Sequence, residues 1–364
     1  MTPTMHEISR HPEMEMVLVV TDQHLYRKFG HTVQEVEDNF PVAAWIDMEQ
    51  DGDSDVDRAR AIGRCLTKIS DVFADLKPDI ILIIGDRGEV FAACIAAHNM
   101  RIAIAHVQGG DISGSLDEPV RHAITKLSHI HFPSIESSAQ RILNMGEEPW
   151  RVHIVGDTHI DQIFFNKIPE AEALWTRYGL PIDDGFILVL QHSDSTNPRH
   201  STAQMVETIA ALSSINMRTL FVYPCSDQGY EGIINEIERA ADPPRFTVHR
   251  NIPAPEFIGL QRLATCMVGN SSAGLIEAPY FGLPAVNIGD RQVGRQRAGN
   301  VLDVPHDRVA IEAAIRKALT NVEFRKELKH LQPPFGDGQA YKKITRVLAS
   351  VEINDQLLNK RMTY

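Results

Sequence analysis

The chain has 364 residues, 43% of them hydrophobic, so it can bury substantial cores, and its length favours two domains over one. A formal net charge of -12 argues against a nucleic-acid-binding protein, because such proteins carry basic surfaces that neutralise phosphates. No signal segment opens the sequence, no apolar run approaches the roughly 20 residues of a membrane helix, and the cysteines show no paired spacing, so we expect a cytoplasmic protein without a membrane partner.

Short apolar runs rich in β-branched residues alternate with longer helical patterns, which is typical of a parallel sheet covered on both faces. A first series of predicted strands covers residues 14–20, 42–47, 80–85, 102–107 and 152–156. A helical stretch at 161–184, closed by a loop at 180–185 that contains Pro and Gly, separates it from a second series at 186–191, 219–223, 246–249, 266–269 and 285–288. A last helical segment spans residues 339–358.

These elements predict an α/β protein of two Rossmann-like domains with parallel sheets that meet at a cleft. We place the N-terminal domain at residues 1–163 and the C-terminal, nucleotide-binding domain at residues 164–345. The helical residues 346–364 are expected to pack back on the first domain.

Polar residues follow the predicted strands of the first domain, at the edge where ligands bind in open α/β sheets. Asp86 and Arg87 follow the third strand and place a carboxylate beside a guanidinium, although a structural ion pair between them is an equal alternative. Gln108 follows the fourth strand in a loop with two glycines, where the backbone can approach a ligand closely. Asp117 stands where a helix begins, so it is either a site residue or a helix N-cap.

The second domain offers a candidate site for a nucleotide diphosphate. Ser271 and Ser272 lie between an apolar strand and a helical pattern, where backbone N–H groups and the positive end of the helix dipole attract anions. Glu277 follows within two turns, where a carboxylate can accept from two sugar hydroxyls. His192 ends a strand and can donate to a phosphate or transfer a proton, although a lone histidine is more often structural. Arg291 begins a dense arginine cluster, which is either a diphosphate contact or a solvated face.

The remaining histidine pair and the cysteines are interpreted as structural. His129 and His131 are two residues apart in a short extended run, so they point to opposite faces, and we predict no metal site there. The cysteines are expected to be buried apolar fillers: Cys65, Cys94, Cys225 and Cys266.

Several of these motifs, taken in chain order, resemble the hydrolysing UDP-N-acetylglucosamine 2-epimerases: the runs at residues 85–89, 106–110, 117–129, 269–282 and 287–304. The similarity extends from about residue 2 to about residue 351, and the ordered set is far more specific than any one motif. The resemblance implies a glycosyltransferase-B-like fold with the active site in the cleft between the two domains. It also implies assembly as a homodimer or homotetramer, a UDP-sugar substrate, and neither a metal nor a redox cofactor.

The resemblance also implies that UDP is eliminated across C1 and C2 of the sugar and that water is added to the 2-acetamidoglucal intermediate, converting UDP-N-acetylglucosamine to N-acetylmannosamine and UDP. This reaction needs a base for the C2 proton and cations or N–H groups for the departing diphosphate. Asp86 and Asp117 match acid–base residues of the family, with Arg121 beside them. The implied nucleotide contacts are Arg87, His192, Ser271, Ser272, Glu277 and Arg291, and His192 is also counted among the catalytic residues.

The chain departs from the family pattern in several places. Gln108 stands where many relatives carry a glutamate, and a carboxamide can orient substrate or water but cannot exchange a proton. Ser193 and Cys225 replace a common proline and asparagine. Relatives begin with a strand and a Gly-Thr-Arg-type loop, whereas this sequence starts at what resembles the following helix. We expect that strand near the middle of the first sheet, so either the start is internal to a longer reading frame or another segment fills the gap.

The favoured hypothesis is a hydrolysing 2-epimerase that acts on UDP-N-acetylglucosamine in the synthesis of a sialic-acid-like nonulosonate. One alternative keeps this reaction but takes a UDP-2,4-diacetamido-trideoxyhexose. A glycosyltransferase of the same fold is disfavoured because nothing resembles an acceptor-binding insertion. A non-catalytic nucleotide-sugar binder is the third possibility.

Overall fold

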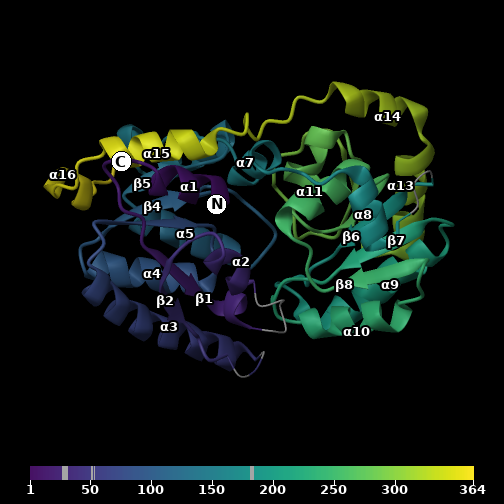
Figure 1. Ribbon diagram of the computed structural model, residues 1–364, viewed down its shortest axis with the longest axis horizontal. Coiled ribbons are helices and arrows are strands. Elements are labelled where there is room, and N and C mark those ends of the chain that lie inside the picture. Colours follow the sequence, from purple (N-terminus) through teal and green to yellow (C-terminus); the bar gives the residue numbers. More distant parts are fainter. Residues whose placement is uncertain (27–31, 51, 53, 181–183) are drawn as a thin grey trace. The chain divides into compact units, whose positions relative to one another are not determined.

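The computed structural model describes residues 1–26, 32–50, 52, 54–180 and 184–364 of the chain. It forms two compact α/β units with parallel sheets, which confirms the predicted fold class (Figure 1). Unit 1 comprises Met1–Ile112, Leu116–Asp161 and Phe335–Tyr364, and unit 2 comprises Ser113–Ser115 and Gln162–Pro334. Part of the predicted loop at 180–185, residues 181–183, lies outside the described residues.

Unit 1 contains two parallel sheets. One consists of β1 (Leu18–Thr21) and β2 (Val42–Ile46), and the other has the order β3 (Ile80–Ile84), β4 (Ala103–Val107) and β5 (Ile130–Phe132). The family resemblance predicts a strand near the middle of a single sheet here. Within the described part of unit 1, no strand joins the two sheets.

Residues 152–156 do not form the predicted strand. They make an isolated bridge between Val152 and His131, and the amides of His153 and Val155 donate to the carbonyls of His131 and Pro133 at 2.9 and 3.1 Å. Pro133 has no N–H to give in return, which interrupts the ladder after β5. The segment nevertheless runs beside β5 and extends the carboxyl edge of its sheet.

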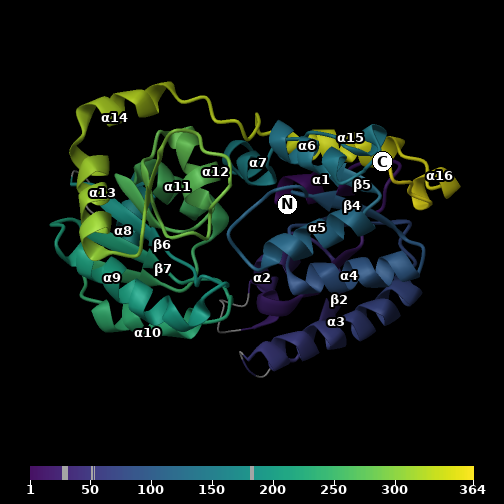
Figure 2. The ribbon, with the colours of Figure 1, turned by 180° about the vertical axis from the view of Figure 1, so that it is seen from behind.

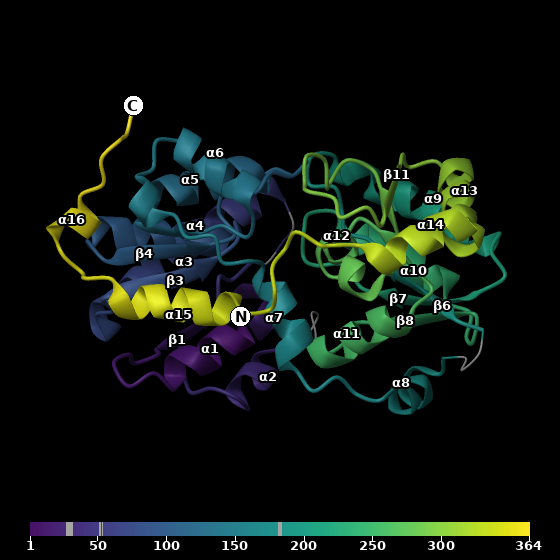
Figure 3. The ribbon, with the colours of Figure 1, turned by 90° about the horizontal axis from the view of Figure 1, so that it is seen from above.

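The helices of unit 1 follow from local signals and an apolar stripe. α3 (Asp55–Leu76) starts with a capping box formed by Ser54 and Asp57, and its buried face repeats every four residues with Ala61, Cys65, Ile69 and Phe73. α3 lies beside α4 (Gly88–Asn99) (Figure 2), and α1 (Thr2–Ser9) lies beside α15 (Ala340–Ser350) (Figure 3). The other helical segments are α2 (Val33–Glu37), α5 (Asp117–Leu127), α6 (Glu136–Asn144), α16 (Asp355–Leu358), η1 (Asp22–Leu25) and η3 (Pro149–Arg151). α7 (Thr158–Phe165) begins in unit 1 and ends in unit 2.

The structure also bears on the predicted burial of the cysteines and on whether any helix could span a membrane. The four cysteines are free; Cys65, Cys94 and Cys266 are buried as predicted, whereas Cys225 is half-buried. In the described ranges, no helix has both the length and the apolar content needed to cross a membrane.

Unit 2 is built on one six-stranded parallel sheet with the order β11-β10-β9-β6-β7-β8. Its strands are β6 (Phe186–Leu190), β7 (Arg218–Val222), β8 (Phe246–His249), β9 (Cys266–Gly269), β10 (Ala285–Ile288) and β11 (Val301–Val304). β8, β9 and β10 have the predicted bounds, and β11 is an edge strand that the sequence analysis did not predict. The strand order reverses at β6, which has β7 on one side and β9 on the other. Such a reversal is the point where open α/β sheets bind ligands.

Helices cover both faces of this sheet. Alternate residues of β6 belong to two separate apolar clusters, with Ile187 in one and Leu188 in the other. α9 (Ser201–Ser213), α10 (Tyr230–Ala240) and α13 (Arg308–Thr320) contribute to the first cluster, and α8 (Ala171–Tyr178) and α11 (Ala254–Leu263) to the second. The shorter helical segments are α12 (Ala273–Ile276), α14 (Val322–Glu327), η4 (Pro198–His200), η5 (Ala278–Phe281) and η6 (Leu328–His330).

Candidate active site

Asp86 and Gln108 leave neighbouring strands at the same edge of the sheet in unit 1. β3 and β4 are parallel with their last residues paired, so the residues that follow them emerge side by side. The amide of Gly85 donates to the carbonyl of Val107 at 3.1 Å. Burial lowers the pKa of His106 to about 3, so its ring is neutral, and its Nε2 donates to the carbonyl of Gly85 at 2.8 Å. These bonds fix the backbone that presents Asp86.

Arg121 is the ion partner of Asp86. Its side chain is only 5% exposed, and a second guanidinium nitrogen donates to the carbonyl of Asp111 at 2.9 Å. Asp117 is the first residue of α5, one turn before Arg121 and on the same helix face. The N-cap position belongs to Leu116, so the alternative role of Asp117 as N-cap is wrong. The structure thus joins Asp86 to Arg121 and sets Asp117 one helical turn away from that pair.

Arg87 has ion partners of its own. Its guanidinium lies 3.1 Å from a carboxylate oxygen of Asp22 and 2.9 Å from one of Glu89. Burial raises the pKa of Glu89, and the nearby Arg87 opposes that shift. Because Asp86 pairs with Arg121, the two members of the predicted Asp86–Arg87 pair are held by different partners. Arg87 is therefore a cation placed between two carboxylates at the start of α4.

The side chain of Gln108 points toward Asp157, which follows the segment 152–156 beside β5. Its side-chain amide donates to the two carboxylate oxygens of Asp157 at 3.0 and 3.1 Å. It also lies 3.1 Å from Nδ1 of His159. Asp157 is buried, and its carboxylate is 2.8 Å from the same ring nitrogen. Neither Asp157 nor His159 is a site residue in the sequence analysis.

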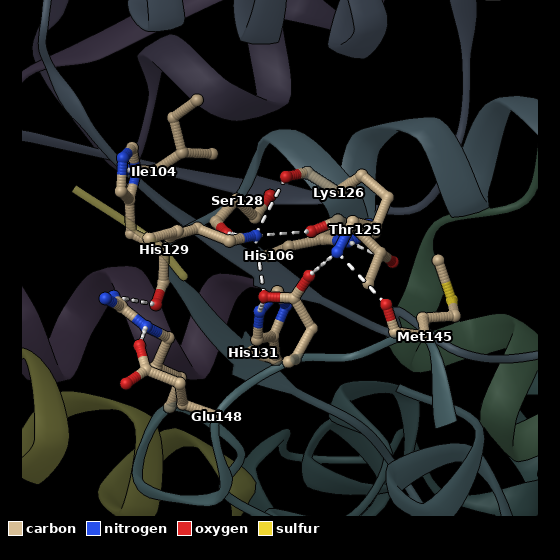
Figure 4. A network of polar contacts seen from close by, with 12 residues as sticks. Ile104, His106, Thr125, Lys126, Ser128, His129, His131, Met145 and Glu148 are labelled. Atoms are coloured by element: carbon tan, nitrogen blue, oxygen red, sulfur yellow. Dashed lines mark hydrogen bonds and ion pairs between the residues drawn. The ribbon is translucent and has the colours of Figure 1, made fainter. Parts of the chain in front are cut away.

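His129 and His131 are both engaged in bonds within unit 1 (Figure 4). Nδ1 of His129 accepts from the amide of Ile104 at 3.0 Å, and Nε2 of His131 lies 3.1 Å from a carboxylate oxygen of Glu147. Burial lowers the pKa of each ring to about 4. Over the part of the chain that the structure describes, no group of His, Cys, Asp and Glu side chains is placed to hold a metal ion.

In unit 2, His192 lies at the point where the strand order reverses. Its amide donates to the side chain of Asn270 at 2.7 Å, and that side chain donates back to the His192 carbonyl at 2.9 Å, which links the ends of β6 and β9. Nδ1 of His192 accepts from the amide of Cys225 at 3.0 Å. In the neutral ring the proton is therefore on Nε2, which makes that atom a hydrogen-bond donor suited to a phosphate oxygen.

Ser271 and Ser272 follow β9, as predicted, but the helix they precede is short. α12 has four residues; Pro279 cannot continue an α-helix, so the chain goes on as the 3-10 segment η5, which ends at the left-handed Gly282. The dipole available to an anion is accordingly weaker than the sequence pattern suggests. Gly269 is needed for the approach of β9 to β6, since a Cβ there would lie 2.1 Å from the carbonyl oxygen of Leu190.

Arg291 joins the same region. One guanidinium nitrogen is 3.1 Å from a carboxylate oxygen of Asp227, and another lies 3.4 Å from the carbonyl of Asn270. Arg297, from the same predicted cluster, bonds to Asp303 at 2.9 Å and to backbone carbonyls, so it has a structural role. Glu277 accepts from the side-chain amide of buried Gln261 at 2.6 Å.

Sequence reasoning missed the residues that orient the predicted ones. Asn270 lies within the motif at residues 269–282, but its uncharged side chain gave no reason to assign it a role. Gln261 lies on another helix, 16 residues from Glu277. The other orienting groups are Asp22, Glu89, Asp157, His159 and Asp227.

Residues 6–349 match the protein family described as UDP-N-acetylglucosamine 2-epimerase. The chain is 33% identical to the UDP-N,N'-diacetylbacillosamine 2-epimerase (hydrolyzing) of Legionella pneumophila, over 100% of this chain and 96% of that protein. It is 30% identical to the UDP-N-acetylglucosamine 2-epimerase of Neisseria meningitidis serogroup B, over 88% of this chain and 84% of that protein.

Solved structures show the same fold. The structure of UDP-GlcNAc 2-epimerase from Neisseria meningitidis bound to UDP-GlcNAc matches with a TM-score of 0.81 and 19% identity, over 96% of this chain and 95% of that chain. The UDP co-structure of MnaA from S. aureus matches with a TM-score of 0.78, over 96% and 92%. With a family match across nearly the whole sequence, the chain belongs to the UDP-N-acetylglucosamine 2-epimerase family, as its motifs predict.

Proposed function

We propose that this protein is a hydrolysing UDP-sugar 2-epimerase. In the elimination step a base takes the C2 proton, the C–H electron pair becomes the C1=C2 bond, and the C1–O electron pair leaves with UDP. In the hydration step a proton returns to C2 from the opposite face and water supplies a hydroxyl to C1. The products are UDP and the free 2-epimeric sugar.

The observation that carries this proposal is the arrangement of Asp86, Arg121 and Asp117 at the carboxyl edge of the β3-β4-β5 sheet. Two carboxylates on separate elements can serve as base and acid, because different surroundings give them different affinities for a proton. The Arg121 guanidinium is ion-paired with Asp86, and Asp117 lies a turn earlier on α5. We assign Asp86 and Asp117 as the two groups that carry a proton to and from C2.

We assign the nucleotide to the residues at the strand reversal of unit 2. The Nε2 donor of His192 and the guanidinium of Arg291 would neutralise the charge that develops on the departing diphosphate. Ser271 and Ser272 add donors beside them, and Glu277 would accept from the ribose hydroxyls. Arg291 is already oriented by Asp227, so it costs little reorganisation when the substrate binds.

Two sugars have support as substrate. The relative with 33% identity is named for UDP-N,N'-diacetylbacillosamine, and the one with 30% identity for UDP-N-acetylglucosamine. These sugars share the 2-acetamido group, which is carried by the carbon that is epimerised, and differ at C4 and C6. We propose a UDP-2-acetamido sugar as the substrate class and retain both as candidates, with the coverage of the Legionella protein favouring the diacetamido sugar.

The proposal is tested by incubating the protein with each UDP-sugar, with and without sugar acceptors, and following UDP and sugar by NMR. A hydrolysing epimerase releases equal amounts of UDP and free 2-epimeric sugar without an acceptor. Turnover that requires an acceptor would identify a glycosyltransferase, and binding without UDP release would identify a nucleotide-sugar binder.

A further inference from the structure

His159 and Asp157 form a histidine–carboxylate pair beside Gln108. This pair has no part in the proton transfers assigned above to Asp86 and Asp117. Asp157 is 1% exposed and accepts from the backbone amide of His159 at 2.8 Å and from the hydroxyl of Ser134 at 3.3 Å. Nδ1 of His159 lies 2.8 Å from the same carboxylate. A carboxylate can only accept, so we assign the proton of the neutral ring to Nδ1 and the lone pair to Nε2. The Gln108 amide nitrogen lies 3.1 Å from Nδ1, and its two hydrogens are directed to the oxygens of Asp157.

This pair has the arrangement in which a buried aspartate orients a histidine that acts as a general base. The side chain of His159 is 48% exposed, while that of Asp157 is 1% exposed. The carboxylate therefore lies beneath the ring and fixes its tautomer, while the imidazole remains accessible to a small molecule.

The sheet places the pair on the same edge as the proposed acid–base residues. β3, β4 and β5 run parallel in that order, and the segment after Val152 continues beside β5. Asp86 follows β3, Gln108 follows β4, and Asp157 follows the segment beside β5. Gln108 is thus the middle member of the row, and its amide is bonded to Asp157. Its backbone has the uncommon left-handed φ of 63°, which a side chain adopts at an energetic cost.

The reaction proposed above involves three proton transfers. One carrier removes the C2 proton, a second returns a proton to C2 on the other face, and a third takes a proton from the water that attacks C1. Asp86 and Asp117 account for the first two. A carboxamide at position 108 cannot be the third, because it does not exchange a proton at neutral pH.

We propose that His159 is the base that activates water in the hydration step, a role that rests on the function proposed above. Nε2 of His159 accepts a proton from water as the water oxygen bonds to C1. The electrons of the C1=C2 bond take a proton at C2 from the carboxylic acid of Asp117 or Asp86. Asp157 holds the imidazole in place and stabilises its protonated form, and Gln108 fixes Asp157.

The test compares wild type with His159→Gln, which keeps a polar side chain but cannot accept the proton. We expect UDP release and UDP affinity close to wild type, whereas free-sugar formation falls about 10²–10⁴-fold and the 2-acetamidoglucal accumulates in NMR spectra. The matched control is His98→Gln, an exposed histidine of α4, which should release UDP and free sugar in equal amounts.

Other results of this experiment would contradict either the role of His159 or the function on which it rests. A His159→Gln variant that forms free sugar as fast as it releases UDP overturns the proposal. A variant that loses UDP release together with hydration also overturns it, because His159 would then act in elimination or in folding. Failure of the proposed function would appear in wild type instead, as an absence of UDP release, and would remove this inference with it.

Discussion

The replacement Asp86→Asn tests the acid–base assignment and its structural basis together. It leaves the guanidinium of Arg121, whose side chain is 5% exposed, without its counter-charge. Removing one partner of a buried ion pair costs about 3–5 kcal/mol. Asn keeps an oxygen acceptor and the Asp111 carbonyl remains bonded to Arg121, so we expect the lower end, about 3 kcal/mol. Loss of the proton carrier should lower kcat about 10²–10⁴-fold.

Turnover is measured from UDP release, UDP affinity by calorimetry, and stability by urea unfolding. UDP affinity should stay within about twofold, because Asp86 pairs with Arg121 and all of the proposed nucleotide contacts except Arg87 lie in unit 2. The control is Asp303→Asn, which disturbs a more exposed pair with Arg297 and should cost less than about 1 kcal/mol without affecting turnover. Retained turnover in Asp86→Asn would refute the assignment, and a parallel loss of UDP affinity would show that the protein had unfolded.

Three further replacements have separate readouts. Glu277→Ala should weaken UDP binding about tenfold, because it removes acceptors for the ribose; an unchanged affinity in calorimetry would remove Glu277 from the nucleotide site. Burial lowers the pKa of His106 to about 3, so the stability that depends on its neutral ring is fully present above pH 6.5 and is lost as the pH falls toward 3. Between pH 7 and pH 5, wild type should therefore lose about 2 kcal/mol of unfolding free energy that His106→Gln does not lose. Equal losses in the two proteins would show that His106 is not held neutral. Lys360 bonds to Glu147 and to the carbonyl of Ser128, each at 2.6 Å, so Lys360→Met should speed proteolytic cleavage of the C-terminal segment. The control Lys343→Met, at a side chain that is 41% exposed, should not; equal cleavage of both variants would contradict the anchoring role.

The fold was largely predictable because most of its strands are short runs of mainly apolar and β-branched residues. β9 and β10 are buried throughout, and β8 has Phe246 and Val248 at alternate positions; the bounds of these three strands match the prediction. β11 was missed because it is an edge strand interrupted by Asp303. The segment of β5 was recognised as extended but was not counted among the predicted strands, because it has three residues, one of them His131. In both cases the decisive factor is the pairing with a neighbouring strand, which local composition does not reveal.

The candidate site was predictable where charged residues directly follow strands. Asp86, His192 and Ser271 all lie at carboxyl ends, where chain order alone places them. Their partners come from distant segments: Arg121 is 35 residues from Asp86, and His159 is 51 residues from Gln108. No periodicity or spacing connects such residues, because the sheet order brings them together. Within the arginine cluster at 291–297, Arg297 bonds to Asp303, a partner that the spacing of the arginines does not reveal.

The central claim is that aspartates of unit 1 move a proton at C2 while UDP leaves as an intact group. It is tested most directly by running the reaction in D₂O and determining the deuterium at C2 of the free sugar by NMR. The account predicts a 2-epimeric sugar with one solvent-derived deuterium at C2 and an equal amount of UDP. A free sugar that keeps its original C2 hydrogen, or one released without inversion at C2, would contradict it.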